Sequence, residues 1–349
     1  MRIALLLSGG VDSSVACALL KEAGHDVHAF YLKFWLEDEL AHLSDCPWEE
    51  DLQYAHAVCK HLSVPLKILN IQHAYWECVV KDVLEQIRQG LTPNPDILCN
   101  ERMKLGMFLR LVGRLADKVA TGHYAQTKQK EGMYTLIRSP DPVKDQTYFL
   151  ATLTQQQLSK TLFPIGHLTK ADVRKFAAER NLPTKNRKDS QGICFLGRIK
   201  FKAFIKHHLG EQEGPIIEYE TGTTLGTHKG HWFYTAGQRE GLGLGHGPWY
   251  VVKKNPSTNT IYVSRHYSLL DKERRVFTTT QLHWISGTPP RQQQLLVKLR
   301  HGPKLNTCTI TLTKGGAKIA LKEKDQGISP GQYAVFYDND ECIGCGIIT

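Results

Sequence analysis

The feature that most constrains this chain is an apolar run that ends in a glycine- and serine-rich turn and leads directly into a helix-like segment. Residues 2–7 suit a strand that is buried on both faces of a parallel sheet. Residues 11–23 place apolar side chains at helical spacing, and Gly24 provides a C-terminal stop. A strand, a tight turn and a helix in this order predict an α/β fold that starts at residue 2.

Strand-like and helix-like segments continue to alternate through the first half of the chain. We expect strands at residues 27–32, 66–71 and 118–121, and helices at residues 50–62, 76–88, 103–115 and 170–180. The last of these helices follows Thr169-Lys170-Ala171-Asp172, which resembles a capping box. Such alternation predicts a doubly wound parallel sheet that binds ligands at the carboxyl ends of its strands.

The character of the chain changes after Gly214, where glycines become frequent and short alternating strands replace helices. We expect a hairpin around residues 314–317 and further strands at residues 333–337 and 343–348. The predicted organisation is an α/β domain at residues 1–205, a small mixed central domain at 206–274 and a C-terminal β-barrel at 275–349.

The net charge of the chain is +10, from 44 Lys and Arg against 34 Asp and Glu. A basic surface attracts polyanions, and because the charge is spread out, it indicates a folded nucleic-acid surface rather than a basic tail. A merely basic enzyme is the alternative. No stretch approaches the ~20 apolar residues of a membrane span, and Met1–Leu7 is too short for a secretory segment. We therefore expect a cytoplasmic protein.

Nine cysteines, an odd number, argue against a disulfide framework. Cys17 and Cys59 fall at apolar positions of expected helices and should be core residues. Cys99 is expected in a loop, because Pro93 and Pro95 disfavour regular structure around it, and Cys194 is expected in a second loop. A single loop cysteine is more often inert than catalytic, but a fold could bring together these two, which are 95 residues apart in the sequence.

A further pair, Cys342 and Cys345, forms a C-x-x-C near the C-terminal end of the sequence. No second pair accompanies it, so a zinc site is not expected. We interpret these residues as two incidental thiols on an edge strand.

The turn Ser8-Gly9-Gly10-Val11-Asp12-Ser13-Ser14 has the features of an anion cradle. Its glycines let the backbone approach a ligand closely, and the amides at a helix start point toward it. Asp12 can cap the helix or help to hold Mg²⁺. A Walker A loop would need a lysine before its serine, and none is present. The alternative is a plain glycine turn before a capped helix.

This turn resembles the PP-loop of the N-type ATP pyrophosphatases, which cleave ATP to AMP and pyrophosphate while adenylating an oxygen atom of a substrate. The resemblance implies ATP and Mg²⁺ as cofactors. It also implies the following ATP contacts: Leu7, Ser8, Gly9, Gly10, Val11, Asp12, Ser13, Ser14, Leu32 and Gly122.

Five more segments follow in the order of one particular family. They are residues 94–100, 120–124, 144–148, 189–195 and 235–243. Together with the turn, they resemble the tRNA-specific 2-thiouridylase family over most of the chain. Two positions depart from the family pattern: Leu32 stands where Met is common, and His301 stands where a Tyr is expected.

The resemblance implies a reaction in which ATP adenylates O2 of the wobble uridine of a tRNA. Cys194 would carry a persulfide received from an upstream sulfur-donor protein, and Cys99 would be its partner nucleophile. The terminal sulfur could attack C2 directly, or Cys99 could release it as hydrosulfide. A Cys99–Cys194 disulfide would result and would have to be reduced before the next turnover. Asp96 is the candidate acid or base.

The same resemblance assigns the tRNA contacts in three groups, of which the third comes from the barrel. They are Asn94, Pro95 and Asp96 at the target base, then His123, Lys144, Asp145 and Gln146 along its approach, then Arg300, His301 and Gln332.

Three other hypotheses remain open. The chain could be a PP-loop enzyme that uses an amine nucleophile, or a non-catalytic protein that binds tRNA and ATP. An iron–sulfur cluster held by Cys99, Cys194 and Asp96 is the third. No other metal site is expected. A monomer is expected, because no coiled-coil pattern is visible.

Overall fold

The computed structural model describes residues 1–34, 48–189, 200–266, 274–325 and 327–349. Its first part is built on a sheet of five parallel strands in the order β3-β2-β1-β4-β7. The strands are β1 (Arg2–Leu6), β2 (Asp26–Lys33), β3 (Leu66–Asn70), β4 (Lys118–Ala120) and β7 (Thr161–Leu162). The expected parallel sheet is confirmed.

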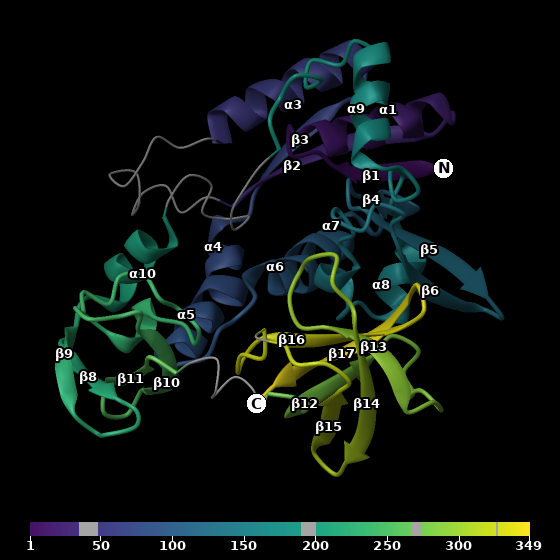
Figure 1. The fold of residues 1–349 in the computed structure, drawn as a ribbon. Coiled ribbons are helices and arrows are strands. Elements are labelled where there is room, and N and C mark those ends of the chain that lie inside the picture. The colour runs from purple at the N-terminus through teal and green to yellow at the C-terminus, as the bar shows by residue number, and fades with distance from the viewer. Residues whose placement is uncertain (35–47, 190–199, 267–273, 326) are drawn as a thin grey trace.

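Helices cover both faces of this sheet (Figure 1). On one face, α1, α3 and α9 pack on Ile3, Leu5 and Leu7, and Cys17 and Cys59 lie in this core as expected. On the other face, helical segments between residues 72 and 112 pack on Ala4 and Leu6. Successive side chains of β1 therefore point into two separate cores, one on each face of the sheet, as in a doubly wound fold.

The helices largely follow the expected ranges. They are α1 (Val11–Glu22), α3 (Trp48–Leu62), α4 (Gln72–Tyr75), α5 (Lys81–Arg88), α6 (Pro95–Leu98), α7 (Phe108–Val112), α8 (Gln155–Lys160), α9 (Lys170–Glu179) and α10 (Phe201–Leu209). Wider π-helical turns at Trp76–Val80 and Cys99–Met107 join α4 to α5 and α6 to α7, and short 3₁₀ turns lie at Thr147–Leu150 and His231–Phe233. Thr169 caps α9 in a capping box with Asp172, as predicted.

The expected loop around Cys99 is wrong. Pro95 occupies the first turn of α6, where a proline loses no hydrogen bond and its fixed φ suits a helix. The side chain of Asn94 caps this helix by accepting from the amide of Ile97 at 3.2 Å. Pro95 therefore begins a helix instead of excluding one, whereas Pro93 precedes the cap, and Cys99 follows as a buried helical residue.

The C-terminal part is a closed barrel of antiparallel strands in the order β12-β15-β14-β13-β16-β17, with β17 returning to β12. The strands are β12 (Val276–Trp284), β13 (Gln294–Lys298), β14 (Asn306–Thr313), β15 (Gly316–Leu321), β16 (Tyr333–Asp338) and β17 (Glu341–Ile348). A hairpin from the first half, β5 (Ala125–Lys130) and β6 (Met133–Arg138), extends this sheet by pairing β6 with β17.

This pairing corrects the expectation for Cys342 and Cys345. Strand β17 has neighbours on both sides, so it is not an edge strand. Both thiols are buried, and burial raises the pKa of each one well above its usual value. They remain protonated and pack as small apolar side chains.

The central part contains a four-stranded sheet in the order β10-β11-β8-β9, next to α10. Its strands are β8 (Gly214–Glu218), β9 (Thr224–His228), β10 (Tyr250–Asn255) and β11 (Thr260–Ser264). His231 contacts the end of α5 through its Nε2, which lies 3.1 Å from the carbonyl oxygen of Arg88. The predicted boundary between residues 205 and 206 falls within α10, and the division into three domains stays a prediction.

A buried ion pair joins the barrel to the α/β part. Lys298 Nζ on β13 lies 2.7 Å from Asp145 Oδ2, and both side chains are 0% exposed. Arg138 Nε approaches the same carboxylate oxygen at 3.3 Å, and the hydroxyl of Thr147 donates to Asp145 Oδ1 at 2.9 Å. The segment that contains Asp145 is therefore held by the barrel. Within the described residues, no helix is long and apolar enough to span a bilayer.

Lys298→Met should destabilise the protein by about 3–5 kcal/mol, because it leaves the Asp145 carboxylate buried without its cation. The measurement is the free energy of unfolding in urea. Arg300→Met, on a side chain that is 60% exposed, is the matched control and should cost less than about 1 kcal/mol. Equal effects of the two substitutions would contradict the role of burial.

Candidate functional site

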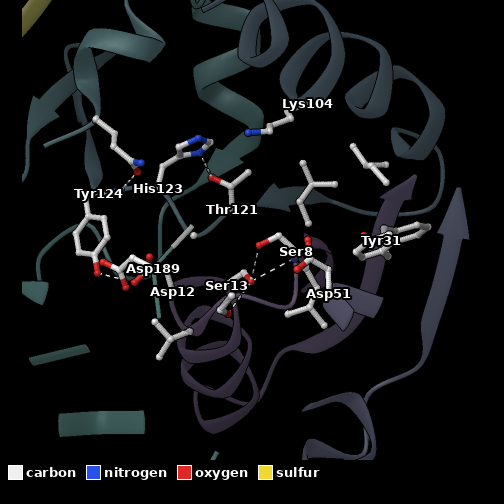
Figure 2. Close-up of a pocket in the computed structure, with 18 of the residues that line it drawn as sticks. Ser8, Asp12, Ser13, Tyr31, Asp51, Lys104, Thr121, His123, Tyr124 and Asp189 are labelled. Carbon is white, nitrogen blue, oxygen red and sulfur yellow. Dashed lines mark hydrogen bonds between the residues drawn. The ribbon is translucent and has the colours of Figure 1, made fainter. Parts of the chain in front are cut away.

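A pocket of about 360 Å³ opens at the carboxyl ends of β1, β2 and β4 (Figure 2). This is the edge at which a doubly wound sheet binds its ligands, and the volume is in the range of small-molecule sites. Several chain segments contribute to its wall: residues 6–8, 10–13, 30–32, 34, 51, 104, 121–124, 144, 146, 188 and 189.

The turn after β1 is organised by its serines. The hydroxyl of Ser13 accepts from the amide of Ser8 at 3.2 Å and donates to the carbonyl of Gly10 at 3.1 Å. Ser14 donates to the same carbonyl at 2.8 Å. Gly10 stands at the N-cap of α1 and brings no side-chain cap, so Asp12 does not cap this helix. The first amides of α1 and the helix dipole are thus available to an anion.

Two glycines permit the close packing of this turn. Gly9 has φ +77°, and a Cβ there would lie 2.2 Å from the carbonyl oxygen of Asp51. A Cβ on Gly122 would lie 2.7 Å from the amide nitrogen of Ser13. Both positions therefore require glycine, one for its backbone conformation and both for space.

The opposite wall of the pocket is apolar. Leu7 and Leu32 are buried residues that line it, together with Phe30. An apolar wall beside an amide-rich helix start fits a ligand with a flat base at one end and phosphates at the other. Most of the predicted ATP residues therefore line one cavity, and they are Leu7, Ser8, Gly10, Val11, Asp12, Ser13, Leu32 and Gly122. Gly9 and Ser14 belong to the same turn but do not line the cavity.

Sequence reasoning assigned no site role to Tyr124, Lys170 or Asp189, which gather around Asp12 and Lys144. The hydroxyl of Tyr124 donates to Asp12 Oδ1 at 2.6 Å, and Lys170 Nζ lies 2.7 Å from the same atom. Lys170 also pairs with Asp189 at 2.8 Å, and Lys144 Nζ lies 2.7 Å from the other oxygen of Asp189. Burial by itself would raise the pKa of Asp189, but the bonds from Lys144 and Lys170 hold it well below its usual value.

Arg187 is a second missed residue. Its guanidinium donates to the carbonyl of Gly9 at 2.6 Å and also binds the carboxylate of Asp51. It lies over the ring of Tyr54, with 4.5 Å from Cζ to the ring centroid. The capping box at Thr169 was a usable signal for Lys170, because it places Lys170 in the first turn of a helix. No local pattern singled out Arg187.

His123 lines the pocket in its neutral form. Its Nδ1 lies 2.8 Å from the hydroxyl oxygen of Thr121. Burial, with a smaller contribution from the charge of Lys104, lowers the pKa of His123 to about 3. Its ring therefore offers a neutral donor or acceptor at neutral pH.

A second group of predicted residues meets where the barrel contacts α6. The rings of His301 and Phe149 stack with centroids 4.8 Å apart, and Asp96 is close enough to His301 to influence its charge. The hydroxyl of Tyr148 lies 3.4 Å from Gln332 Oε1. His301 thus keeps a stacked aromatic ring at the position where a Tyr was expected. Burial, with a smaller contribution from Lys298, lowers the pKa of His301.

The segment at residues 144–148 connects the two groups. Lys144 and Gln146 line the pocket, and Gln146 Oε1 accepts from the amide of Tyr124 at 3.0 Å. Tyr148 reaches the barrel, and Asp145 between them is buried against Lys298. The side chain of Asp145 therefore faces the protein interior, and the expected contact of this side chain with RNA is not available in this conformation.

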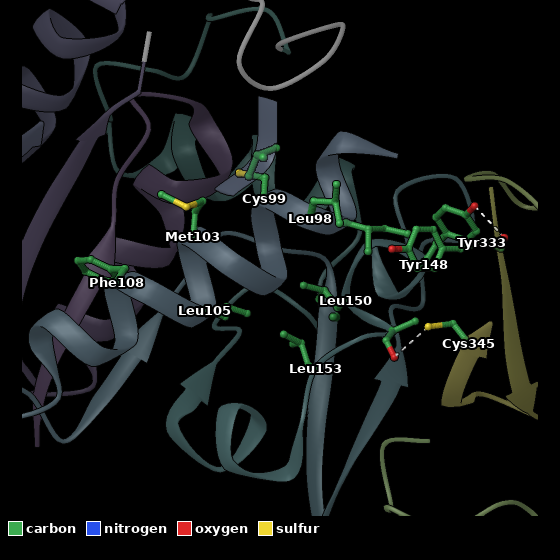
Figure 3. Close-up of a cluster of buried hydrophobic side chains, with 14 of the residues drawn as sticks. Leu98, Cys99, Met103, Leu105, Phe108, Tyr148, Leu150, Leu153, Tyr333 and Cys345 are labelled. Carbon is green, nitrogen blue, oxygen red and sulfur yellow. Dashed lines mark hydrogen bonds between the residues drawn. The ribbon is translucent and has the colours of Figure 1, made fainter. Parts of the chain in front are cut away.

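Of the two candidate nucleophiles, the structure describes Cys99 alone. Cys99 is 1% exposed and lies in an apolar cluster with Leu98 and Met103 (Figure 3). Cys194 lies outside the described residues, so a Cys99–Cys194 contact stays a prediction. Arg300 pairs with Asp325, which belongs to neither group, and its guanidinium lies 3.6 Å from the Asp325 carboxylate.

Comparison with known proteins gives matches over the whole chain. Residues 1–198 match the tRNA methyl transferase HUP domain family, residues 202–265 the tRNA methyl transferase PRC-barrel domain, and residues 274–348 the aminomethyltransferase beta-barrel domain. The chain is 44% identical over 356 residues to the tRNA-specific 2-thiouridylase MnmA 1 of Bacteroides thetaiotaomicron, with 100% of each chain covered. It is also 44% identical to proteins named tRNA-specific 2-thiouridylase MnmA from Parabacteroides distasonis and Porphyromonas gingivalis, with 100% of this chain and 99% of each relative covered.

Gly122→Ala should weaken ATP binding at least about tenfold, equivalent to about 1.4 kcal/mol, because the added methyl group displaces the backbone at Ser13. Titration calorimetry with ATP is the measurement. Gly315→Ala, where a Cβ meets nothing within 4 Å, should bind ATP like the wild type. Unchanged affinity in Gly122→Ala would show that this contact does not shape the site.

The neutral state of His123 predicts a loss of stability in acid. An unfolded histidine takes up a proton as the pH falls below about 6.5, whereas folded His123 resists it until about pH 3. The free energy of unfolding should therefore fall between pH 7 and pH 4, and His123→Gln should flatten this dependence. His56→Gln, on an exposed side chain of α3, should keep the wild-type slope.

Proposed function

The chain belongs to the family of tRNA-specific 2-thiouridylases, and from this premise we propose that it is an ATP-dependent enzyme that replaces oxygen with sulfur at C2 of a tRNA uridine. One observation carries the proposal. Residues 144–148 connect the pocket with the helix-start anion cradle to the group that contains Asp96 and His301. A nucleotide and a base of the RNA can thus meet along one segment.

The chemistry begins with activation of a poor leaving group. The uridine O2 attacks the α-phosphorus of ATP, the bond to pyrophosphate breaks, and the base becomes adenylated. The first amides of α1 and the hydroxyls of Ser8 and Ser13 would bind the departing pyrophosphate. Mg²⁺ would be held by the carboxylate of Asp12, and it would supply positive charge to the phosphates.

Sulfur then displaces the adenylated oxygen. The terminal sulfur of a Cys194 persulfide attacks C2, and AMP leaves with the original O2. The thiolate of Cys99 attacks the Sγ of Cys194, which breaks the sulfur–sulfur bond and leaves sulfur on the base. A Cys99–Cys194 disulfide results, and an external dithiol must supply two electrons to reduce it.

The remaining roles follow the positions of the residues. Asp96 is partly buried beside His301 and would transfer the proton of the uridine or the thiol. The tRNA contacts would come from Asn94, Pro95, Asp96, His123, Lys144, Gln146, Arg300, His301 and Gln332. Asp145 would act by holding Lys144 and Gln146 in place. We further propose that the enzyme is a cytoplasmic monomer that receives sulfur from a persulfide-carrying protein.

The first experiment is nucleoside mass spectrometry on unmodified tRNA incubated with the protein, ATP, Mg²⁺ and a persulfide source. We expect 2-thiouridine, and a loss of at least about a thousandfold in Cys99→Ser and in Cys194→Ser, with tRNA binding retained. Cys78→Ser, at an exposed cysteine, is the matched control and should remain active.

The other outcomes separate the competing functions. AMP release with an unchanged uridine would favour a PP-loop enzyme with an amine nucleophile. Binding of ATP and tRNA without AMP release would favour a binding protein. Visible absorbance of an anaerobic preparation, lost in Cys194→Ser, would favour an iron–sulfur cluster on Cys99, Cys194 and Asp96 over the persulfide route.

A further inference from the structure

Charged side chains beside the pocket form a continuous series of ion pairs, and two of its members, Lys170 and Asp189, have no role in the proposed reaction. Lys144 Nζ lies 2.7 Å from Asp189 Oδ2, and Lys170 Nζ lies 2.8 Å from Asp189 Oδ1. Lys170 Nζ also lies 2.7 Å from Asp12 Oδ1. We call Lys144, Asp189, Lys170 and Asp12 the ion-pair chain. It begins at a predicted tRNA contact and ends in the ATP turn.

Exposure changes along the ion-pair chain. The side chain of Lys170 is 15% exposed, whereas that of Lys144 is 36% exposed. A buried ammonium that leaves its carboxylates gains no water in exchange, whereas a more exposed ammonium is hydrated when it leaves. Lys144 is therefore the end of the chain that can leave its carboxylate for an RNA phosphate.

Lys170 divides one positive charge between two carboxylates. A ligand cation that takes up the charge of Asp12 would weaken the contact of Asp12 with Lys170, and the ammonium would then move closer to Asp189. Asp189 already binds Arg174 as well. With Lys170 drawn fully to it, Asp189 would hold Lys144 less tightly.

The backbone at both lysines is fixed by a separate residue. Asp141 Oδ2 accepts from the amide of Lys170 at 3.0 Å, and Asp141 Oδ1 accepts from the amide of Lys144 at 3.1 Å. The two side chains can therefore change partners while their backbone positions stay in place. A substitution that removes only the ammonium of Lys170 leaves this backbone contact intact.

We propose that Lys170 and Asp189 are positioning residues that couple occupation of the ATP turn to the binding of tRNA by Lys144. The proposal rests on the proposed function, because Lys144 is taken as an RNA contact. Engagement of Asp12 by ATP and its cation shifts Lys170 to Asp189, and Lys144 becomes available to a phosphate of the tRNA. Linkage makes the effect reciprocal, so bound tRNA tightens ATP binding by the same factor.

The test is the affinity for an unmodified tRNA transcript, measured by filter binding with and without a non-hydrolysable ATP analogue and Mg²⁺. In the wild type, the analogue should tighten tRNA binding at least about fivefold. In Lys170→Gln, the ratio of the two affinities should fall to below about twofold. Lys170→Arg keeps the charge and should restore part of the ratio.

Lys175→Gln is the matched control, because Lys175 lies on the same helix and pairs with Glu179 at an exposed position. It should keep the wild-type ratio. Asp189→Asn is a second variant, used if Lys170→Gln melts at a lower temperature than the wild type, and it should also lower the ratio. The proposal is overturned if the wild-type ratio is one, if both variants keep it, or if Lys175→Gln lowers it equally. Because 2-thiouridine formation is measured separately, an active wild type with a ratio of one would remove the coupling and leave the proposed function standing.

Discussion

The contact between Lys298 and Asp145 determines how the two main parts of this protein fit together. Both charges have left water, which costs free energy that only good geometry and additional hydrogen bonds can offset. Arg138 and Thr147 supply those bonds. Because Asp145 lies between Lys144 and Gln146, which line the pocket, the barrel fixes part of the pocket from outside the α/β part.

The pocket also shows how the proposed phosphate site can do without a lysine in its turn. The turn after β1 supplies amides and hydroxyls, and positive charge comes from other elements of the fold. Lys104, Lys144 and Lys188 line the pocket from three separate segments. Such an arrangement separates the cradle, which is local in sequence, from the charge that balances it, which depends on tertiary structure. The lysine side chains can then also bind groups other than phosphate, as Lys144 binds Asp189.

This difference explains what could be predicted from the sequence. The strand–turn–helix at residues 2–22 and the capping box at Thr169 are local patterns, and the structure confirms both. The prediction of a loop around Cys99 was wrong, because a proline in the first turn of a helix gives the same local signal as a proline in a loop. Arg187 and Asp189 contact residues more than 40 positions away, so no periodicity could reveal them. The family resemblance supplied candidate residues, but not the burial of Asp145.

The pairing of β6 with β17 has a consequence for the order in which the protein is made. Arg138 and Asp340, at the ends of this pairing, are 202 residues apart. At the usual speed of translation, about 10 to 40 s pass between the emergence of the two strands from the ribosome. During that interval β6 presents an uncovered edge, and the apolar residues beneath β16 and β17 face water. The first half of the chain therefore completes its core only after the barrel has been synthesised, and a nascent chain of this kind is a natural client for chaperones that shield unpaired strands.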